Sequence, residues 1–260
     1  AEVKDFEPLA FIERKSVRHM DRFAQFAVSA AKMAVADAGL SLEKVDRNRV
    51  GIFIGSGIGG IGTIEQQHRV LLERGPGRVN PFFIPMLISN IGGSQIAIEL
   101  DLKGPNLCVV SACASAANSI GEALRVLQRG EAEVMLAGGS EAAITPLALG
   151  GFCSMRAMST RNDDPQTASR PFDRDRDGFV IGEGAGVLVL ETLEHARMRK
   201  AQILAELSGY ATNCDAFHVV QPAPDGLGAS RAMQEAIADA GLKAEDIDYI
   251  NAHGTTSTTA

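Results

Sequence analysis

A cysteine, Cys113, stands where an apolar segment at 107–111 is followed by small residues that open a helix. Unpaired N–H groups and the positive end of the dipole at a helix N-terminus lower the pKa of a nearby thiol, and the thiolate is the nucleophilic form. A free cysteine is also a common small core residue. Position alone therefore leaves two interpretations of Cys113 open, a nucleophile and a packing residue.

The elements around Cys113 predict an α/β fold. Apolar segments alternate with helical periodicity, an order typical of a sheet whose strands are mostly buried. Residues 107–111 are predicted to form a buried strand, and apolar residues from Ala116 to Leu127 mark one face of the following helix. Further helices are predicted at 22–39, 61–73 and 90–100, and further strands at 49–55, 133–138 and 179–190, the last with a glycine-rich bend. The polar stretch 156–178 is predicted to cross the surface.

Composition excludes several classes of function. The net charge of −7 without a Lys/Arg cluster disfavours nucleic-acid binding. No apolar run is long enough to cross a membrane, and the first residues do not form a signal peptide. The four cysteines, Cys108, Cys113, Cys153 and Cys214, show no paired spacing, which argues against a zinc site or a disulfide framework. A reducing cytoplasm is the expected location.

Residues 55–60 satisfy the G-x-G-x-x-G pattern directly after a predicted strand. A dinucleotide site also requires a compact helix, a second strand and an acidic residue about 20 positions later. The segment 74–83, rich in glycine and proline, predicts a loop instead. We therefore do not expect a nicotinamide cofactor.

A repeated sequence motif indicates an internal duplication. The motif at 36–40 recurs at 238–242, and in each copy a helix ending at glycine is followed by a predicted strand, at 49–55 and at 249–254. A further strand is predicted at 203–211. We expect residues 1–190 to form a first half and residues 191–260 the start of a second, so that the chain is an internal piece of a longer protein.

Several motifs in order resemble the beta-ketoacyl-acyl-carrier-protein synthases, the bacterial condensing enzymes of type II fatty acid biosynthesis. They lie at 110–115, 151–152, 169–173, 176–186 and 251–255. The resemblance covers essentially the whole chain. It implies the thiolase-like fold of two duplicated α/β halves in α-β-α-β-α layers, with the second half truncated here, and a homodimer.

The resemblance also implies a mechanism. Cys113 would accept an acyl group from acyl-carrier protein, and its own N–H would form part of an oxyanion hole. Malonyl-acyl-carrier protein would then lose carbon dioxide and attack the acyl group, giving a 3-ketoacyl product. His253 would bind the malonyl thioester carbonyl. No metal or cofactor is expected, because the phosphopantetheine arm enters with the carrier-bound substrate.

Other site residues follow from the same resemblance. Thr255 matches a hydroxyl that contacts the phosphopantetheine arm, and Ser257 or Thr258 occupies the second hydroxyl position of a threonine-rich end that departs from the family pattern. Phe152 and Ile58 match substrate-pocket residues, although each is equally consistent with plain core.

Basic side chains could contact the acidic carrier protein. The candidates are Arg18, Arg156 and His218. Exposed arginines are more often simply solvated. The remaining histidines, His19, His68 and His195, lie in polar helical contexts and are predicted to be at the surface.

The family's second catalytic histidine, its lysine and its gating phenylalanine segment have no counterpart in these 260 residues. The chain alone is therefore expected to be inactive in condensation. Two alternatives remain: a noncatalytic subunit resembling a chain-length factor, and a polyketide-type ketosynthase or a thiolase acting on coenzyme A thioesters. Cys113 argues against the noncatalytic subunit, which usually lacks the nucleophile.

Overall fold

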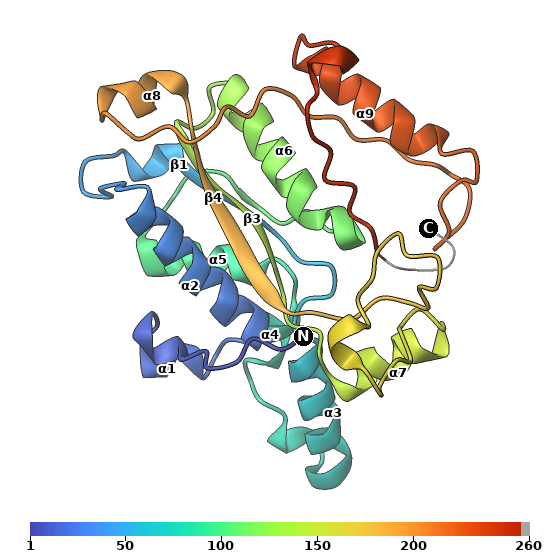
Figure 1. The fold of residues 1–260 in the computed structure, drawn as a ribbon. Coiled ribbons are helices and arrows are strands. Elements are labelled where there is room, and N and C mark those ends of the chain that lie inside the picture. Colours follow the sequence, from blue (N-terminus) through green and yellow to red (C-terminus); the bar gives the residue numbers. More distant parts are fainter. Residues whose placement is uncertain (256–260) are drawn as a thin grey trace. The chain divides into compact units, whose positions relative to one another are not determined.

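The computed structural model describes residues 1–255, which form two compact units. The first unit comprises residues 1–148 and 182–205 and contains a four-stranded sheet (Figure 1). The strand order is β2-β1-β3-β4, with β1 at Val50–Gly55, β2 at Asn106–Leu107, β3 at Val134–Glu141 and β4 at Gly184–Glu191. The first three strands are parallel, and β4 is antiparallel to β3. The carboxyl ends of β1 and β3 therefore lie at one edge.

Helices cover both faces of this sheet. Helix α6 (Ser115–Gln128) packs on one face against β1 and β3, and α2 (Arg22–Asp37) with α5 (Ile91–Leu100) covers the other (Figure 1). The alternation of side chains along a strand divides the core accordingly. Ile52 and Ile54 of β1 pack with the α2 cluster, whereas Phe53 packs with the α6 cluster.

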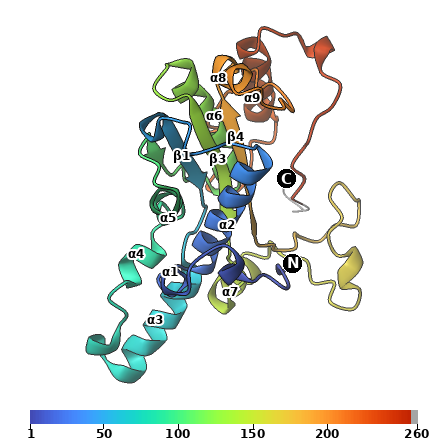
Figure 2. The same ribbon diagram turned by 90° about the vertical axis from the view of Figure 1, so that its left-hand side faces the viewer.

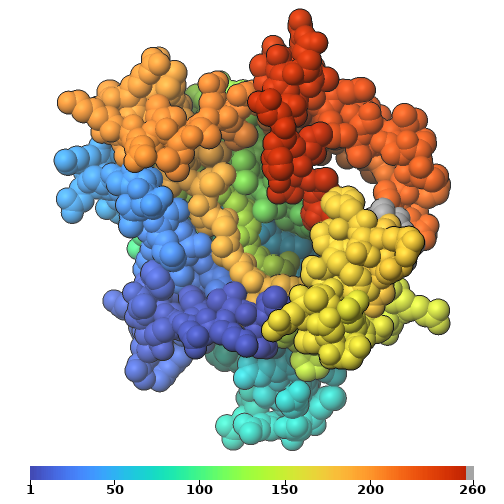
Figure 3. All heavy atoms as spheres, viewed as in Figure 1, coloured from blue at the N-terminus to red at the C-terminus, as the bar shows by residue number. Residues whose placement is uncertain are grey.

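The remaining elements of the first unit flank the sheet. Helices α3 (Ile61–Arg74) and α4 (Phe83–Leu87) extend beyond its edge (Figure 2). Helix α1 (Arg14–Val17) belongs to an N-terminal segment whose apolar side chains pack on the α2 cluster, and Figure 3 shows this segment in dark blue beside the lighter blue of α2. Helix α8 (Leu193–Met198) follows β4.

The second unit comprises residues 149–181 and the described residues from 206 onward. Helix α7 (Pro146–Ser154) leads into it, and α9 (Leu227–Asp239) is its longest element. The segment before α9 packs closely on that helix: the Tyr210 N–H donates to Asp239 at 2.8 Å, and a Cβ on Gly209 would lie 2.8 Å from the Ala240 nitrogen.

Short 3-10 turns complete the chain. They lie at Pro8–Ala10, Arg47–Arg49, Pro76–Arg78, Ala112–Ala114, Pro165–Thr167 and Ala244–Asp246. No helix in residues 1–255 is both long and apolar enough to span a membrane.

The two copies of the repeated motif, at 36–40 and 238–242, end their helices in the same way. Gly39 and Gly241 have φ angles of +59° and +69°. Each is followed by a leucine whose N–H bonds back to the helix, from Leu40 to Val35 at 3.1 Å and from Leu242 to Ile237 at 3.0 Å. This is the Schellman cap, which requires a left-handed residue that glycine adopts without strain.

Three predicted strands were wrong. At 107–111 only Leu107 pairs with β1, and Leu107 and Val110 are exposed rather than buried. The segments 203–211 and 249–254 are not strands, since neither has a hydrogen-bonded neighbour strand among the described residues. The predicted strand at 179–190 begins only at Gly184. An apolar run indicates a propensity to form a strand, but the strand forms only where a neighbouring strand can pair with it.

Candidate active site

Cys113 lies in the 3-10 turn Ala112–Ala114 that runs directly into α6, and its side chain is exposed. The residue before it, Ala112, has a φ of +51°, which is uncommon for a residue with a Cβ. The buried Ser115 hydroxyl holds this turn: it accepts the Ser111 N–H at 2.9 Å and donates to the Ala112 carbonyl at 2.7 Å. The Asn118 amide donates to the Ser111 hydroxyl at 2.7 Å. The backbone thus presents the thiol at the start of a 14-residue helix.

Two glycines let this helix start approach the sheet. A Cβ on Gly55, the last residue of β1, would lie 2.6 Å from the Ser115 carbonyl carbon. A Cβ on Gly139, its partner in β3, would lie 2.6 Å from the Ala116 Cβ. Both distances are too short for any side chain. The first glycine of the G-x-G-x-x-G pattern therefore serves close helix packing.

A half-buried carboxylate organises the turn that follows β1. Glu141, the last residue of β3, accepts the Gly57 N–H at 2.8 Å, the Ile58 N–H at 3.1 Å and the Ser56 hydroxyl at 3.2 Å. Burial raises the pKa of Glu141 above its usual value, and these hydrogen bonds oppose that effect. Sequence reasoning did not single out Glu141. The available signal was an acid directly after a buried apolar strand.

Cys108 contrasts with Cys113. Its thiol is half-buried, and burial raises the pKa of that thiol, an effect increased by the charge of Glu141. A raised pKa leaves less thiolate at neutral pH. Burial thus disfavours the nucleophilic form of Cys108, whereas Cys113, Cys153 and Cys214 are exposed.

In the second unit, His253 occupies a tight turn and is exposed, with a φ of +66°. Its N–H donates to the Asn251 side chain at 3.3 Å, and the Gly254 N–H donates to the Ala252 carbonyl at 2.8 Å. A Cβ on Gly254 would lie 2.8 Å from the Phe172 ring. The motifs at 251–255 and 169–173, far apart in sequence, are thus neighbours in this unit.

The predicted substrate residues divide between the units. Ile58 belongs to the first, where its N–H binds Glu141 and its side chain is 37% exposed. Phe152 belongs to the second, where it is half-buried and meets Phe179 edge to face at 5.2 Å. Thr255 is half-buried, while Ser257 and Thr258 lie outside the described residues. The substrate roles of these residues stay predictions.

The predicted carrier-contacting residues are exposed. Arg18 caps the C-terminus of α1, and Arg156 has a φ of +54°. The His218 Nδ1 accepts the N–H groups of Val220 and Gln221, each at 3.1 Å, which gives this ring a local structural role. Carrier contact by these residues stays a prediction.

The prediction for His195 was wrong. Its ring is buried and lies 2.6 Å from the Glu191 carboxylate, to which Arg199 also donates at 2.7 Å. Arg199 in turn donates to the Ala38 carbonyl at the end of α2, at 2.8 Å. The helical period that placed His195 on a polar face could not reveal these partners on β4 and α2.

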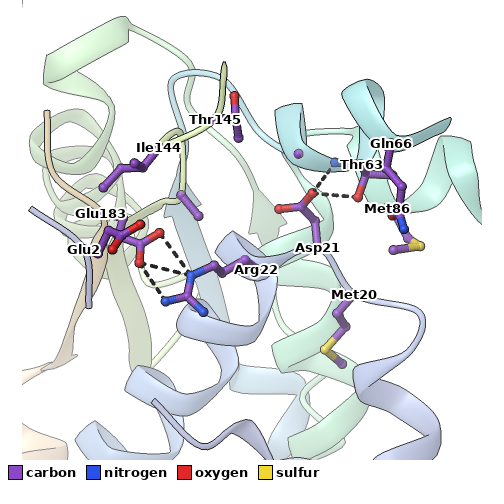
Figure 4. Close-up of a pocket in the computed structure, with 12 residues that line it drawn as sticks. Glu2, Met20, Asp21, Arg22, Thr63, Gln66, Met86, Ile144, Thr145 and Glu183 are labelled. Carbon is purple, nitrogen blue, oxygen red and sulfur yellow. Dashed lines mark hydrogen bonds and ion pairs between the residues drawn. The ribbon is translucent and has the colours of Figure 1, made fainter. Parts of the chain in front are cut away.

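A cavity of the first unit is lined by residues other than the predicted site residues (Figure 4). In it Asp21 points toward Thr63, accepting the Thr63 N–H at 2.9 Å and its hydroxyl at 2.6 Å. Arg22 points toward Glu183 at 2.7 Å. Burial favours a higher pKa for Glu183, but hydrogen bonds from Arg22 and the Val3 N–H hold it below the usual value. Because Asp21, Arg22 and Glu183 already bind other residues of the protein, we assign them structural roles.

No group of three or more His, Cys, Asp or Glu residues is placed to hold a metal ion within the part of the chain that the structure describes.

These features match those of one family of proteins. The family model for the beta-ketoacyl synthase N-terminal domain matches residues 1–196, and that for the C-terminal domain matches residues 204–260. The chain belongs to the beta-ketoacyl synthase family. The predicted family resemblance is thereby confirmed.

Particular relatives refine this assignment. The chain is 53% identical over 256 residues to 3-oxoacyl-[acyl-carrier-protein] synthase 2 of Synechocystis, covering 98% of this chain and 62% of that protein. A beta-ketoacyl synthase crystal structure from Burkholderia phymatum has a TM-score of 0.92 at 39% identity, covering 100% of this chain and 63% of that one. A type II polyketide ketosynthase in complex with its acyl-carrier protein has a TM-score of 0.89 at 30% identity, covering 99% of this chain and 62% of that one.

The predicted thiolase-like α/β fold class is confirmed by these structures. The chain spans about 62% of the length of the curated relatives that it matches. The division at residue 190 and the roles of the site residues stay predictions.

Proposed function

We propose that this chain carries the acyl-accepting cysteine of a 3-oxoacyl-acyl-carrier-protein synthase of type II fatty acid biosynthesis. The observation that carries the proposal is the exposed Cys113 thiol, held by a strained turn at the start of α6. The names of its relatives support the reaction class.

In the first step, the Cys113 thiolate attacks the carbonyl carbon of an acyl thioester on acyl-carrier protein. A bond forms between Sγ and the acyl carbon, the bond to the carrier sulfur breaks, and the carrier leaves as a thiol after taking up a proton. Negative charge develops on the thioester oxygen. The Cys113 N–H and the dipole of α6 favour that charge at the helix start.

In the second step, malonyl-acyl-carrier protein loses carbon dioxide. The electron pair of the broken carbon–carbon bond forms an enolate, which attacks the acyl carbon on Cys113 and releases the thiolate with a 3-ketoacyl product. His253 is proposed to donate a hydrogen bond to the malonyl thioester oxygen, which stabilises the enolate. The exposed ring of His253 supports this role.

The proposed partners are acyl-carrier protein and malonyl-acyl-carrier protein. Support comes from the carrier-protein complex of the related polyketide ketosynthase. The exposed side chains of Arg18, Arg156 and His218 are candidate contacts for an acidic carrier. A homodimer and a cytoplasmic location belong to the same proposal. The cysteines described as free agree with a reducing compartment.

The test is acyl transfer followed by peptide mass spectrometry. The chain is incubated with octanoyl-acyl-carrier protein and digested, and the octanoyl mass is expected on the peptide that contains Cys113. The Cys113→Ala variant should lose the label, whereas Cys153→Ala should keep it. Octanoylation of Cys108, Cys153 or Cys214 with Cys113 unmodified would contradict the proposal, and a chain that takes no octanoyl group would favour the noncatalytic alternative.

A further inference from the structure

The carboxylate of Glu141 is the centre of a hydrogen-bonded turn beside the nucleophile. One carboxylate oxygen, Oε2, accepts the N–H groups of Gly57 and Ile58, and Oε1 accepts the Ser56 hydroxyl. The Ser56 hydroxyl also accepts the Gly59 N–H at 3.0 Å. Four consecutive residues after β1 are thus arranged around one side chain from the neighbouring strand.

This turn lies directly against the backbone that carries Cys113. A Cβ on Gly57 would be 3.1 Å from Glu141 Oε2 and 3.4 Å from the Ala112 carbonyl oxygen. The Ala112 Cα would be 3.6 Å from the same point. Gly57 therefore lies close both to the Glu141 carboxylate and to the residue that precedes Cys113.

Ala112 needs such support. Its φ of +51° belongs to the left-handed region, which is unfavourable for a residue with a Cβ and persists only where the surroundings impose it. Ser115 restrains the turn through its hydroxyl, and Gly57 of the turn at 56–59 lies close to Ala112. Glu141 is the group that fixes the second contact.

Removing a carboxylate even partly from water costs free energy. Its desolvation opposes ionisation and raises the pKa of Glu141, although Gly57, Ile58, Ser56 and the Ala142 N–H all donate to it. Its charge also raises the pKa of the neighbouring Cys108 thiol. A carboxylate that receives this many hydrogen bonds fixes the backbone of the segment around it.

We propose that Glu141 is a positioning residue for Cys113: its carboxylate holds the Ser56–Ile58 turn against Ala112 and so maintains the backbone that presents the thiol. This inference rests on the proposed function, in which Cys113 is the nucleophile. Glu141 touches neither the substrate nor the thiol in this role. It acts through Gly57 and Ala112.

The test compares Glu141→Ala with Glu141→Gln, because glutamine keeps an oxygen that can accept the Gly57 and Ile58 N–H groups whereas alanine keeps none. The rate constant for alkylation of Cys113 by iodoacetamide is followed by peptide mass spectrometry, with the exposed Cys153 and Cys214 as internal references. We expect Glu141→Ala to slow Cys113 about tenfold, the scale on which displaced reacting groups lose rate, while Glu141→Gln stays within about twofold.

A purely structural role predicts a different result. Destabilisation would lower the fraction of folded chains, and would change the rates of the reference cysteines and the circular dichroism spectrum. Positioning predicts an unchanged spectrum, unchanged reference rates and a slower single rate constant at Cys113. Equal Cys113 rates in folded wild type and Glu141→Ala, or failure of glutamine to restore the rate, would overturn the proposal.

A second variant keeps the test decisive if Glu141→Ala does not fold. Gly57→Ala leaves the carboxylate intact and adds one methyl group 3.1 Å from Glu141 Oε2 and 3.4 Å from the Ala112 carbonyl oxygen. It should slow Cys113 alkylation about tenfold as well, whereas Gly77→Ala, whose added methyl group meets no atom within 4 Å, should not. Wild-type rates in Gly57→Ala would refute the inference.

The octanoyl-transfer assay separates this inference from the proposed function. If wild-type Cys113 is alkylated but accepts no octanoyl group, the proposed function fails, and the alkylation rates still decide whether Glu141 positions the thiol. If wild type is octanoylated and Glu141→Ala is octanoylated equally fast, only the role of Glu141 fails.

Discussion

The hydroxyl oxygen of Ser115 accepts the backbone N–H of Ser111 at 2.9 Å, across the turn that carries Cys113. The same hydroxyl donates to the Ala112 carbonyl, so one buried side chain joins the residues on both sides of a left-handed backbone conformation. The geometry of the candidate nucleophile is thus determined by a neighbour on the first turn of α6.

Ser115→Ala should destabilise the fold by about 1–3 kcal/mol, because the Ser111 N–H loses its acceptor in a partly buried position. Urea denaturation followed by circular dichroism measures this change. The alkylation rate of Cys113 should fall in the same variant, because Ala112 is released. A variant with unchanged stability would show that water replaces the hydroxyl without loss.

Gly55→Ala should destabilise the fold by about 1–3 kcal/mol or more, because the new methyl group would overlap the Ser115 backbone and push α6 away from β1. Thermal unfolding measures the loss. The control is Gly150→Ala in α7, where an added Cβ meets nothing within 4 Å and alanine favours the helix. Equal melting temperatures for wild type and Gly55→Ala would disprove the close approach of helix and strand.

Glu191→Gln should destabilise the fold by about 1–3 kcal/mol at pH 7, because charge-assisted hydrogen bonds from Arg199 and His195 are weakened. Burial alone would raise the pKa of Glu191, but the hydrogen bonds from Arg199 and His195 and their charges hold it below the usual value. The control is Glu245→Gln, which alters an exposed ion pair with Lys243 and should leave stability unchanged.

The same carboxylate predicts a pH dependence. A lowered pKa in the folded state means that the stabilisation by Glu191 is complete above the unfolded pKa of about 4.3 and is lost as the pH falls through the folded value. The difference in unfolding free energy between wild type and Glu191→Gln should therefore shrink when urea titrations are repeated between pH 6 and about pH 3. A difference that stays constant over this range would exclude Glu191 as its source.

Asp21→Ala should destabilise the fold by about 2–3 kcal/mol, because the buried carboxylate caps α2 and binds the Thr63 N–H and hydroxyl. Urea midpoints measure the loss. Thr63→Val removes only the hydroxyl contact and should cost less. If Thr63→Val is as damaging as Asp21→Ala, the contribution of the cap and of the N–H contact is negligible.

The local sequence pattern was sufficient to predict most helices and strands of the first unit. The predicted helices at 22–39, 61–73 and 90–100 lie within two residues of α2, α3 and α5 at each end, and the strand predicted at 49–55 differs from β1 by one residue. Burial of one face of a helix requires apolar residues at helical spacing, and burial of a whole strand requires a continuous apolar run. Both patterns can be recognised in the sequence itself.

The pairing of strands could not be predicted from the local sequence pattern. Residues 107–111 and 249–254 were predicted as strands, yet the first contributes only Leu107 to a strand and the second forms none. A strand exists through hydrogen bonds to a neighbour that is distant in sequence, and an apolar run carries no information about that neighbour. The antiparallel direction of β4 beside β3 was hidden for the same reason.

For the candidate site, the sequence by itself determined the chemical groups: Cys113 before a helix, His253 in its own motif, and a family resemblance that the comparisons confirm. Only the tertiary structure decided how the thiol is held. The left-handed conformation of Ala112 cannot be read from its residue type, and the proposed role of Glu141 depends on Gly57 lying close to both Glu141 and Ala112. Residue types are local properties, whereas the contacts that position them arise when distant segments meet.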